Sequence, residues 1–247
     1  MLVRQRYTSA MGRCTRLSVG LSEVELAQAA GTDSAALAEW ESGRRSVPNV
    51  AAKVLTVLTE VVGAAALETV RLIEEGSRSG RIVTFSTDDA VKVATGGAIT
   101  SVRVHRVCAG RAALAVPDAQ VVRRLDGEED RQAWMLCVAA ALGMGLEQVL
   151  KYFDIRRRAG EFWLLGSRPA PEAVLSQVAD IAAEAIVHVQ ELADLVDPDD
   201  PTVRVCTTDA HMGAHWPQHS DLPLVTHQVC AARAAVSAGA DLVYMPS

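Results

Sequence analysis

The chain is poor in aromatic residues and cysteine, and it lacks the long apolar runs of membrane proteins. Aromatic residues make up 4% of its 247 residues while 49% are hydrophobic, so we expect a core of alanine, valine and leucine, which favours helices. No run of 18 apolar residues occurs, which argues against a membrane-spanning helix. Five scattered cysteines predict no disulfide framework, and the N-terminal stretch does not resemble a secretory leader. These absences predict a cytoplasmic protein with no membrane partner.

Signatures of enzymes are missing as well. The sequence has no phosphate-binding loop, nucleophile elbow, H-E-x-x-H or C-x-x-C motif. It has no dinucleotide fingerprint, and no pair of carboxylates stands out in an apolar setting. We therefore expect a protein that is not an enzyme and that carries no cofactor.

The formal net charge of −6 hides an asymmetry along the chain. Residues 1–125 hold 16 lysines and arginines against 12 aspartates and glutamates, whereas residues 126–247 hold 8 against 18. The global charge therefore says little about any one surface, and it does not exclude a nucleic-acid partner.

What the chain does contain is one ten-residue stretch that occurs twice. Residues 105–114 read HRVCAGRAAL and residues 227–236 read HQVCAARAAV. Upstream, IVTFSTD (82–88) matches VRVCTTD (203–209), and four residue types recur at equal offsets around two tryptophans. These pairs are Trp40 and Trp163, Gly43 and Gly166, Arg45 and Arg168, and Pro48 and Pro171. Matches in the same order predict a tandem duplication, with copies at 1–125 and 126–247 and a polar connector at 123–130.

The first copy predicts helices followed by a small strand-containing part. A capping box of Ser22 and Glu25 starts a helix over 21–31, and a second helix follows over 32–43, which together form a helix-turn-helix. Pro48 begins a long helix to about residue 75. A strand over 81–85, a helix over 102–114 and a strand over 119–122 complete the copy. The expected fold class is mainly α with small β (α+β), repeated as two tandem units.

The run LSEVELAQAAGTDSAALAEWESGRRSVPNVAAKV (21–54) resembles the xenobiotic-response-element, or Cro/cI-type, helix-turn-helix family. The W-E-S-G-R-x-x-V-P stretch and the strand–helix–strand tail are more similar to its YdiL-like branch, which includes anti-CRISPR-associated repressors. The resemblance covers roughly 15–122 and, with less similarity, 128–245. It implies helices that bind DNA and a C-terminal part that dimerises. Two fused copies would then form an intrachain pseudo-dimer.

The function that this resemblance implies is a sequence-specific DNA-binding transcriptional regulator, a repressor, of bacterial or phage origin. Its partner would be double-stranded DNA, and a further homodimer of the fused chain is left open. Fusion makes the second DNA contact intramolecular, so pairing no longer depends on concentration.

The predicted reading helices differ between the copies. In copy one the reading positions are Ser34, Ala35 and Ala36, next to the acidic Asp33 and Glu39. In copy two the matching positions are Arg156, Arg157 and Arg158, which suit phosphates and guanine edges. Further phosphate contacts are predicted for Arg4, Arg6, Arg13, Arg16, Arg44, Arg45 and Arg168.

The scaffold of copy two departs from the motif. Asp154 stands where copy one has Gly31, Gly160 replaces Leu37, and Leu164 replaces Glu41. A glycine inside a helix costs about 1 kcal/mol, so a weakened motif is expected there. The two tryptophans and the matched Cys108 and Cys230 are expected to be buried core residues.

Two other hypotheses remain open. The chain could be an antitoxin-like or phage–host interaction module, which would bind a basic protein partner through the acidic Asp33, Glu39 and Glu41. A metal-dependent regulator could use His211, His215 and His219, whose spacing would align three imidazoles on one helix. Gly213 and Pro217 argue against a continuous helix there, so no metal site is assigned.

Overall fold

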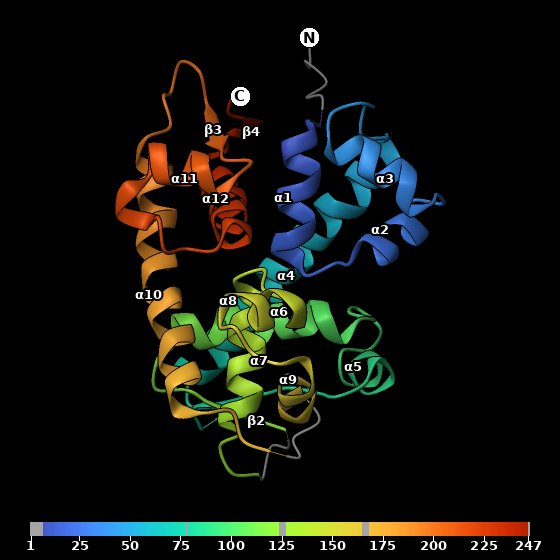
Figure 1. Ribbon diagram of the computed structural model, residues 1–247. Coiled ribbons are helices and arrows are strands. Elements are labelled where there is room, and N and C mark those ends of the chain that lie inside the picture. The colour runs from blue at the N-terminus through green and yellow to red at the C-terminus, as the bar shows by residue number, and fades with distance from the viewer. Residues whose placement is uncertain (1–6, 78, 124–126, 165–167, 247) are drawn as a thin grey trace. The chain divides into compact units, whose positions relative to one another are not determined.

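The computed structural model describes residues 7–77, 79–123, 127–164 and 168–246 (Figure 1). It is mainly helical, with 63% helix and 7% strand, so the predicted class of mainly α with small β is confirmed. Gly166, Arg4, Arg6 and part of the connector at 123–130 lie outside the described residues.

The chain divides into two compact units. Unit 1 combines Met1–Thr59 with Glu184–Ser247, and unit 2 is the continuous segment Glu60–Ala183. Neither unit coincides with 1–125 or 126–247. Each unit therefore joins the first helices of one predicted copy to the strands of the other.

Unit 1 begins with three helices that follow the sequence signals. They are α1 (Ser9–Val19), α2 (Glu23–Ala29) and α3 (Ser34–Glu41), followed by the start of α4 (Asn49–Glu74). Ser22 forms the predicted capping box with Glu25 at the start of α2, and Asp33 caps α3. Gly31, with φ of 67°, makes the left-handed turn between them. Two short helices joined by a tight turn are thus present where the helix-turn-helix of copy one is predicted.

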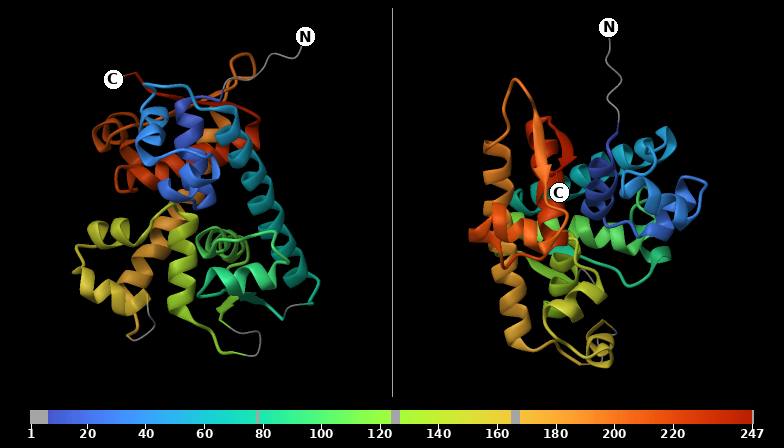
Figure 2. Two further views of the ribbon diagram at one scale, coloured as in Figure 1. Left: turned by 90° about the vertical axis from the view of Figure 1, so that its right-hand side faces the viewer. Right: turned by 45° about the horizontal axis from the view of Figure 1, so that its top comes forward.

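The rest of unit 1 comes from the end of the chain. It contains the last part of α10 (Glu172–Asp194), β3 (Thr202–Val205), α11 (Asp209–His215), a short 3₁₀ helix η1 (Pro217–His219), α12 (Leu224–Ala238) and β4 (Asp241–Tyr244). Strands β3 and β4 are parallel, with Thr202 opposite Asp241. Helix α12 packs against α1 and β3 (Figure 2). The Tyr244 hydroxyl donates to the Glu41 carbonyl oxygen at 3.1 Å, which ties β4 to α3.

Unit 2 has the same kinds of element. After the last part of α4 come β1 (Arg81–Val83), α5 (Asp88–Ala94), α6 (Val102–Ala115), β2 (Gln120–Val122), α7 (Arg131–Ala141), α8 (Leu146–Tyr152), α9 (Arg157–Leu164) and the start of α10. Strands β1 and β2 are parallel, with Arg81 opposite Gln120, and α6 packs on α7. The predicted strands and the helix between them are present. Helix α5 was not predicted, although Thr87 caps it and Asp88 and Asp89 fill its first turn.

The tryptophans and cysteines that the sequence comparison pairs are core residues. Trp40 and Trp163 are both buried, as predicted, and so are Cys108 and Cys230. Sequence reasoning missed a further matched pair, Cys14 in α1 and Cys137 in α7, which are also buried. Burial raises the pKa of the Cys14 thiol to about 12 and that of Cys137 to about 11, so both thiols stay protonated at neutral pH.

Helix α4 bears on the expectation that the chain has no membrane-spanning helix. Its length and composition are those of a helix that can cross a membrane, although no uninterrupted apolar run of 18 residues exists. This is weak evidence, because core helices of other proteins share these properties.

Candidate nucleic-acid interface and histidine cluster

The first helix-turn-helix, α2 and α3 of unit 1, exposes the face that was predicted to read DNA. Leu37 and Trp40 point into the core, whereas Ser34 and Ala35 are exposed and Ala36 is half-buried. This follows from the helical period, which puts residues three and four apart on one face. The predicted reading residues of copy one therefore lie at the surface.

The electrostatics of this first motif are unfavourable for a polyanion. The Asp33 carboxylate is exposed and accepts from the Ala36 amide at 2.8 Å. Glu39 lies 3.7 Å from the guanidinium of Arg45, so one of the two predicted phosphate-binding arginines faces a carboxylate. Arg44 is exposed.

The prediction that Arg16 contacts phosphate is wrong. Arg16 is only 5% exposed, and its Nε and Nη2 donate to the two carboxylate oxygens of Glu41 at 2.5 and 2.9 Å. Its Nη1 donates to the Leu21 carbonyl oxygen at 3.1 Å. Glu41 is thus a buried ion-pair partner and not part of an acidic surface for a basic protein. Arg13 is exposed, and its Nε donates to the Gln228 side chain at 3.2 Å.

Helices α8 and α9 of unit 2, predicted as the second helix-turn-helix, are joined by a turn at Asp154, where the first motif has Gly31. Asp154 adopts φ of 51°, close to the 67° of Gly31 in the first motif. Aspartate tolerates the left-handed region better than most residues. The Ile155 amide donates to the Leu150 carbonyl oxygen at 2.8 Å, as the Thr32 amide donates to Ala27 at 2.9 Å. The turn is therefore formed at Asp154, and the expected weakening of the motif stays a prediction.

The interior glycine does not break this motif either. Gly160 lies buried within α9, and the helix continues through Trp163. The predicted departures at Asp154 and Gly160 are thus both accommodated. The third, Leu164, ends α9, and its side chain lies outside the described part.

The arginines of the second motif gather around the start and the side of α9. Arg156, Arg157 and Arg158 are all exposed, with Arg157 at the first helical position. The guanidiniums of Arg158 and Arg168 lie 5.8 and 4.9 Å from the centre of the Phe162 ring, a cation–π arrangement that brings them to one aromatic side chain. Arg157 forms ion pairs with Glu147 and Glu161.

The two motifs consequently differ in charge. Residues 23–45 contain two arginines against five acidic residues, whereas the matched residues 146–168 contain five basic residues against three acidic ones. Of the two, the α8–α9 motif has the composition of a surface that meets phosphate.

The predicted metal set is not brought together. Helix α11 ends at His215, before Pro217, and His219 lies on η1. His215 is exposed, and the ring centres of His211 and His215 are 6.2 Å apart. His219 is buried and faces α10 instead. The spacing of three histidines therefore does not produce three aligned imidazoles.

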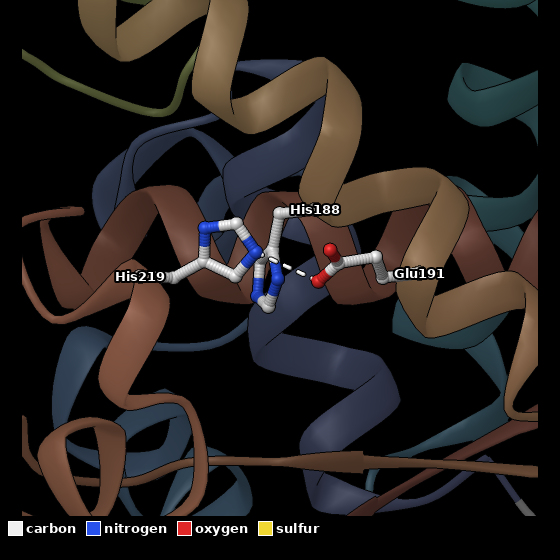
Figure 3. Close-up of side chains that lie close together, drawn as sticks. All are labelled: His188, Glu191 and His219. Carbon is white, nitrogen blue, oxygen red and sulfur yellow. Dashed lines mark hydrogen bonds and ion pairs between the residues drawn. The ribbon is translucent and has the colours of Figure 1, made fainter.

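His219 belongs to a different cluster, drawn in Figure 3. Its Nε2 lies 2.7 Å from Glu191 Oε2 and its Nδ1 lies 3.0 Å from Glu184 Oε1. Carboxylates only accept hydrogen bonds, so this arrangement fits a ring that donates from both nitrogens. The hydrogen bond from His219 outweighs burial and lowers the pKa of Glu191.

The deepest member of this cluster is His188, which is 0% exposed. Its Nε2 lies 2.8 Å from Nδ1 of His227, whose Nε2 accepts from the Cys206 amide at 2.9 Å. Because a backbone amide can only donate, the proton of a neutral His227 is on Nδ1 and is donated to His188. The proton of His188 is then on Nδ1, an atom with no hydrogen-bond partner among the described residues. Burial, followed by neighbouring histidines, lowers the pKa of His188 to about 3 and that of His227 to about 4, so both are neutral.

One group of side chains in the described part of the chain could hold a metal ion, namely His188, Glu191 and His219, whose ligand atoms lie within 4.8 Å of one another. A ligating imidazole needs a free lone pair. Both nitrogens of His219 face carboxylates. In His188, Nε2 accepts the hydrogen bond from His227 and Nδ1 carries the proton, so neither nitrogen has a free lone pair. The cluster is therefore a hydrogen-bonded network that needs no metal to satisfy its histidines.

Sequence reasoning missed Glu184, His188 and Glu191 because it looked for histidines close together in the sequence, and His219 is about 30 residues away from them. A signal was present, however. Their spacing of four and three residues places all of them on one face of α10, where two carboxylates flank a histidine. A histidine–carboxylate pattern on an apolar helix face predicts a buried polar partner.

No family model, no curated protein and no solved structure matches this chain.

Proposed function

We propose that the chain is a sequence-specific DNA-binding transcriptional regulator of the cytoplasm, a repressor, with two helix-turn-helix motifs in one polypeptide. The observation that carries this proposal is the exposed run Arg156–Arg158 at the start of α9, directly after a helix-turn-helix turn. The first turn of a recognition helix is where side chains reach bases and phosphates in this motif.

We also propose that the chain arose by tandem duplication of one such unit and acts as a pseudo-dimer. Elements α1 to β2 and α7 to β4 follow one another in the same order, and both strand pairs are parallel. Thr87 and Thr208 cap the matched helices α5 and α11, and Gly20 and Gly143 end α1 and α7 with φ of 80° and 77°. Independent agreement of caps, turns and strand registers supports a common origin for the two halves.

The two motifs are expected to contribute unequally. Arg45 is paired with Glu39 and Asp33 caps α3, so the α2–α3 motif presents carboxylates where the α8–α9 motif presents guanidiniums. We infer that α9 supplies most of the phosphate contacts, and that Ser34, Ala35 and Ala36 of α3 supply mainly apolar or backbone contacts. We therefore expect a DNA site whose two halves differ in sequence.

Selection of bound duplexes from the genome of the source, or from random sequence, tests this proposal. The change Arg156→Ala/Arg157→Ala/Arg158→Ala should weaken binding to the selected duplex by about 100-fold, from roughly 1 kcal/mol per lost contact. The slope of log affinity against log salt concentration should fall by about 2 to 3, from about 0.9 per phosphate contact.

A matched control is the double variant Arg71→Ala/Arg131→Ala, which removes two exposed arginines of the same unit that lie outside α9. Arg71 pairs with Glu68 on its own helix α4, and Arg131 pairs with Glu172 on α10. Its affinity and salt slope should stay close to those of the wild type. Failure to enrich any duplex, or equal losses in the control and the triple variant, would count against DNA binding.

The acidic span 23–45 favours a second candidate, an antitoxin-like or phage–host module that binds a basic protein. Its surface would be Asp33 and Glu39, since Glu41 is buried. Asp33→Asn/Glu39→Gln should then abolish capture of a stoichiometric protein partner and leave DNA affinity unchanged or higher. The triple arginine variant should have the opposite effect.

A further inference from the structure

The arginine that follows the second helix of each motif contacts a different kind of side chain in the two units. Helices α3 and α9 begin and end 123 positions apart, and so do Arg45 and Arg168. The Arg45 amide donates to the Glu39 carbonyl oxygen at 3.1 Å. The Arg168 amide donates to the Phe162 carbonyl oxygen, again 123 positions later, at 3.3 Å. Equivalent backbone hydrogen bonds therefore bring the arginine to a carboxylate in unit 1 and to an aromatic ring in unit 2.

A carboxylate and a phenyl ring have opposite effects on the charge that an arginine presents. The Glu39 carboxylate lies 3.7 Å from the Arg45 guanidinium, so this pair has no net charge. The Arg168 guanidinium lies 4.9 Å from the centre of the Phe162 ring, which attracts a cation and has no formal charge. Among the described residues Arg168 forms no ion pair. It therefore keeps its positive charge, and its N–H donors remain available to a phosphate.

The Phe162 ring holds a second cation as well. The guanidinium of Arg158, four residues earlier on α9, lies 5.8 Å from the ring centre. Residues four apart share one face of a helix, so this contact lies along the side of α9. No carboxylate pairs with Arg158 in the described part of the chain, unlike its neighbour Arg157. One half-buried ring thus gathers two exposed arginines that no carboxylate neutralises.

The backbone of Arg168 is anchored to the helices around it. The side-chain amide of Gln132, on α7, donates to the carbonyl oxygens of Trp163 and Arg168, the second at 3.1 Å. Arg168 is therefore held both at its amide and at its carbonyl group. With the backbone fixed, the Phe162 ring is the contact that orients the Arg168 side chain.

We propose that Phe162 is a positioning residue for DNA binding, which holds the guanidiniums of Arg158 and Arg168 beside α9 for contact with backbone phosphates. This inference rests on the proposed DNA binding and names the residue that makes the α8–α9 motif the stronger of the two. Glu39, at the matched position of α3, neutralises Arg45 and weakens the other motif.

The test compares the affinities of wild type and folded Phe162 variants for a selected duplex at several salt concentrations. Phe162→Leu keeps an apolar side chain but removes the ring, and it should weaken binding about fivefold, from two cation–π contacts at exposed sites. Phe162→Tyr keeps the ring and should bind as the wild type does. The tyrosine variant separates the role of the ring from a loss of packing, because both variants alter the packing.

A reciprocal exchange tests the charge. Phe162→Glu copies unit 1 and should weaken binding about tenfold and lower the slope of log affinity against log salt concentration by about 1. Glu39→Phe removes the carboxylate beside Arg45 and should raise both the affinity and the slope, the latter by about 1. The control Val93→Glu adds the same charge at a position on α5 that is 83% exposed, and it should change the affinity less than Phe162→Glu does.

The outcomes distinguish this inference from the proposed function. Wild-type affinity and salt slope in folded Phe162→Leu and Phe162→Glu would overturn the role of Phe162 and leave DNA binding in place. Equal losses in the leucine and tyrosine variants would overturn it as well. If the Phe162 variants do not fold, Glu39→Phe decides, and an unchanged affinity and slope would overturn the inference. A wild-type chain that binds no duplex would overturn both proposals.

Discussion

Helices α6 and α7 of unit 2 approach each other closely at Gly110, where α6 has no side chain. A Cβ atom there would lie 2.0 Å from the Cys137 carbonyl oxygen, 2.6 Å from its carbonyl carbon and 2.8 Å from the Ala141 methyl group. Two of these atoms are backbone atoms of α7, so no side-chain rotation relieves the contact. Helices α6 and α7 must separate for any residue other than glycine.

The magnitude for Gly110→Ala follows from two opposed effects. Alanine is more favourable than glycine in a helix interior by about 1 kcal/mol. Overpacking a core costs about 1–3 kcal/mol and more where the backbone must move. Because the contact is with backbone, the upper part of that range applies. We expect a net loss of about 2 kcal/mol in the free energy of unfolding.

Gly63→Ala is the matched control for this substitution. Gly63 lies on α4 in the same unit, and a Cβ there would meet nothing within 4 Å. The free energy of unfolding should therefore rise by up to about 1 kcal/mol. Urea unfolding followed by far-ultraviolet circular dichroism measures both changes. Equal stability of Gly110→Ala and wild type, or a gain in both variants, would refute the close packing of α6 on α7.

Three further outcomes are expected. Glu41→Gln removes the buried charge partner of Arg16 and leaves only the exposed Glu23 at 3.6 Å, so it should cost about 3 kcal/mol in urea unfolding. Arg16→Ala/Glu41→Leu, which copies the residue types at the matched positions of the other half, should cost much less. His188 and His227 have pKa values of about 3 and about 4 in the fold, below the ordinary 6.5, so their contribution to stability is complete above pH 6.5 and is lost as the pH falls toward 4. The free energy of unfolding should fall by up to about 2.7 kcal/mol per pH unit in that window, and a flat profile between pH 6.5 and 4.5 would contradict two neutral buried histidines. Asp130→Ala removes the side chain that accepts from two amides at the start of α7 and should cost about 1–2 kcal/mol by thermal or urea unfolding, while Asp130→Asn, which can still cap, should cost less.

Many of the helix boundaries could be predicted from signals that span only a few residues. Ser22 with Glu25, Gly31 and Pro48 each mark an element boundary through chemistry that acts over a few residues, and the structure has boundaries at those places. No element is predicted between the strand over 81–85 and the helix over 102–114, so helix α5 was missed although Thr87 supplied the same kind of signal.

Non-local pairing accounts for what the sequence did not predict. The buried partner of Arg16 is 25 residues away at Glu41, and an arginine near a chain end is ordinarily exposed. The histidine cluster likewise joins α10 to η1 across about 30 residues. The two halves of the chain contain similar stretches, so the sequence does not indicate whether the strands of one half pack with its own first helices or with those of the other half.

The discontinuous composition of unit 1 has a consequence for synthesis. Translation delivers α1 to α3 well before α12 and β4, the elements of the same unit that pack on α1. Unit 2 is one uninterrupted segment and can close while its neighbour still lacks half of its core. In the nascent chain α1 therefore lacks these partners until residues 224–244 have been made, and a chain that stops before them would leave that side of α1 unpacked.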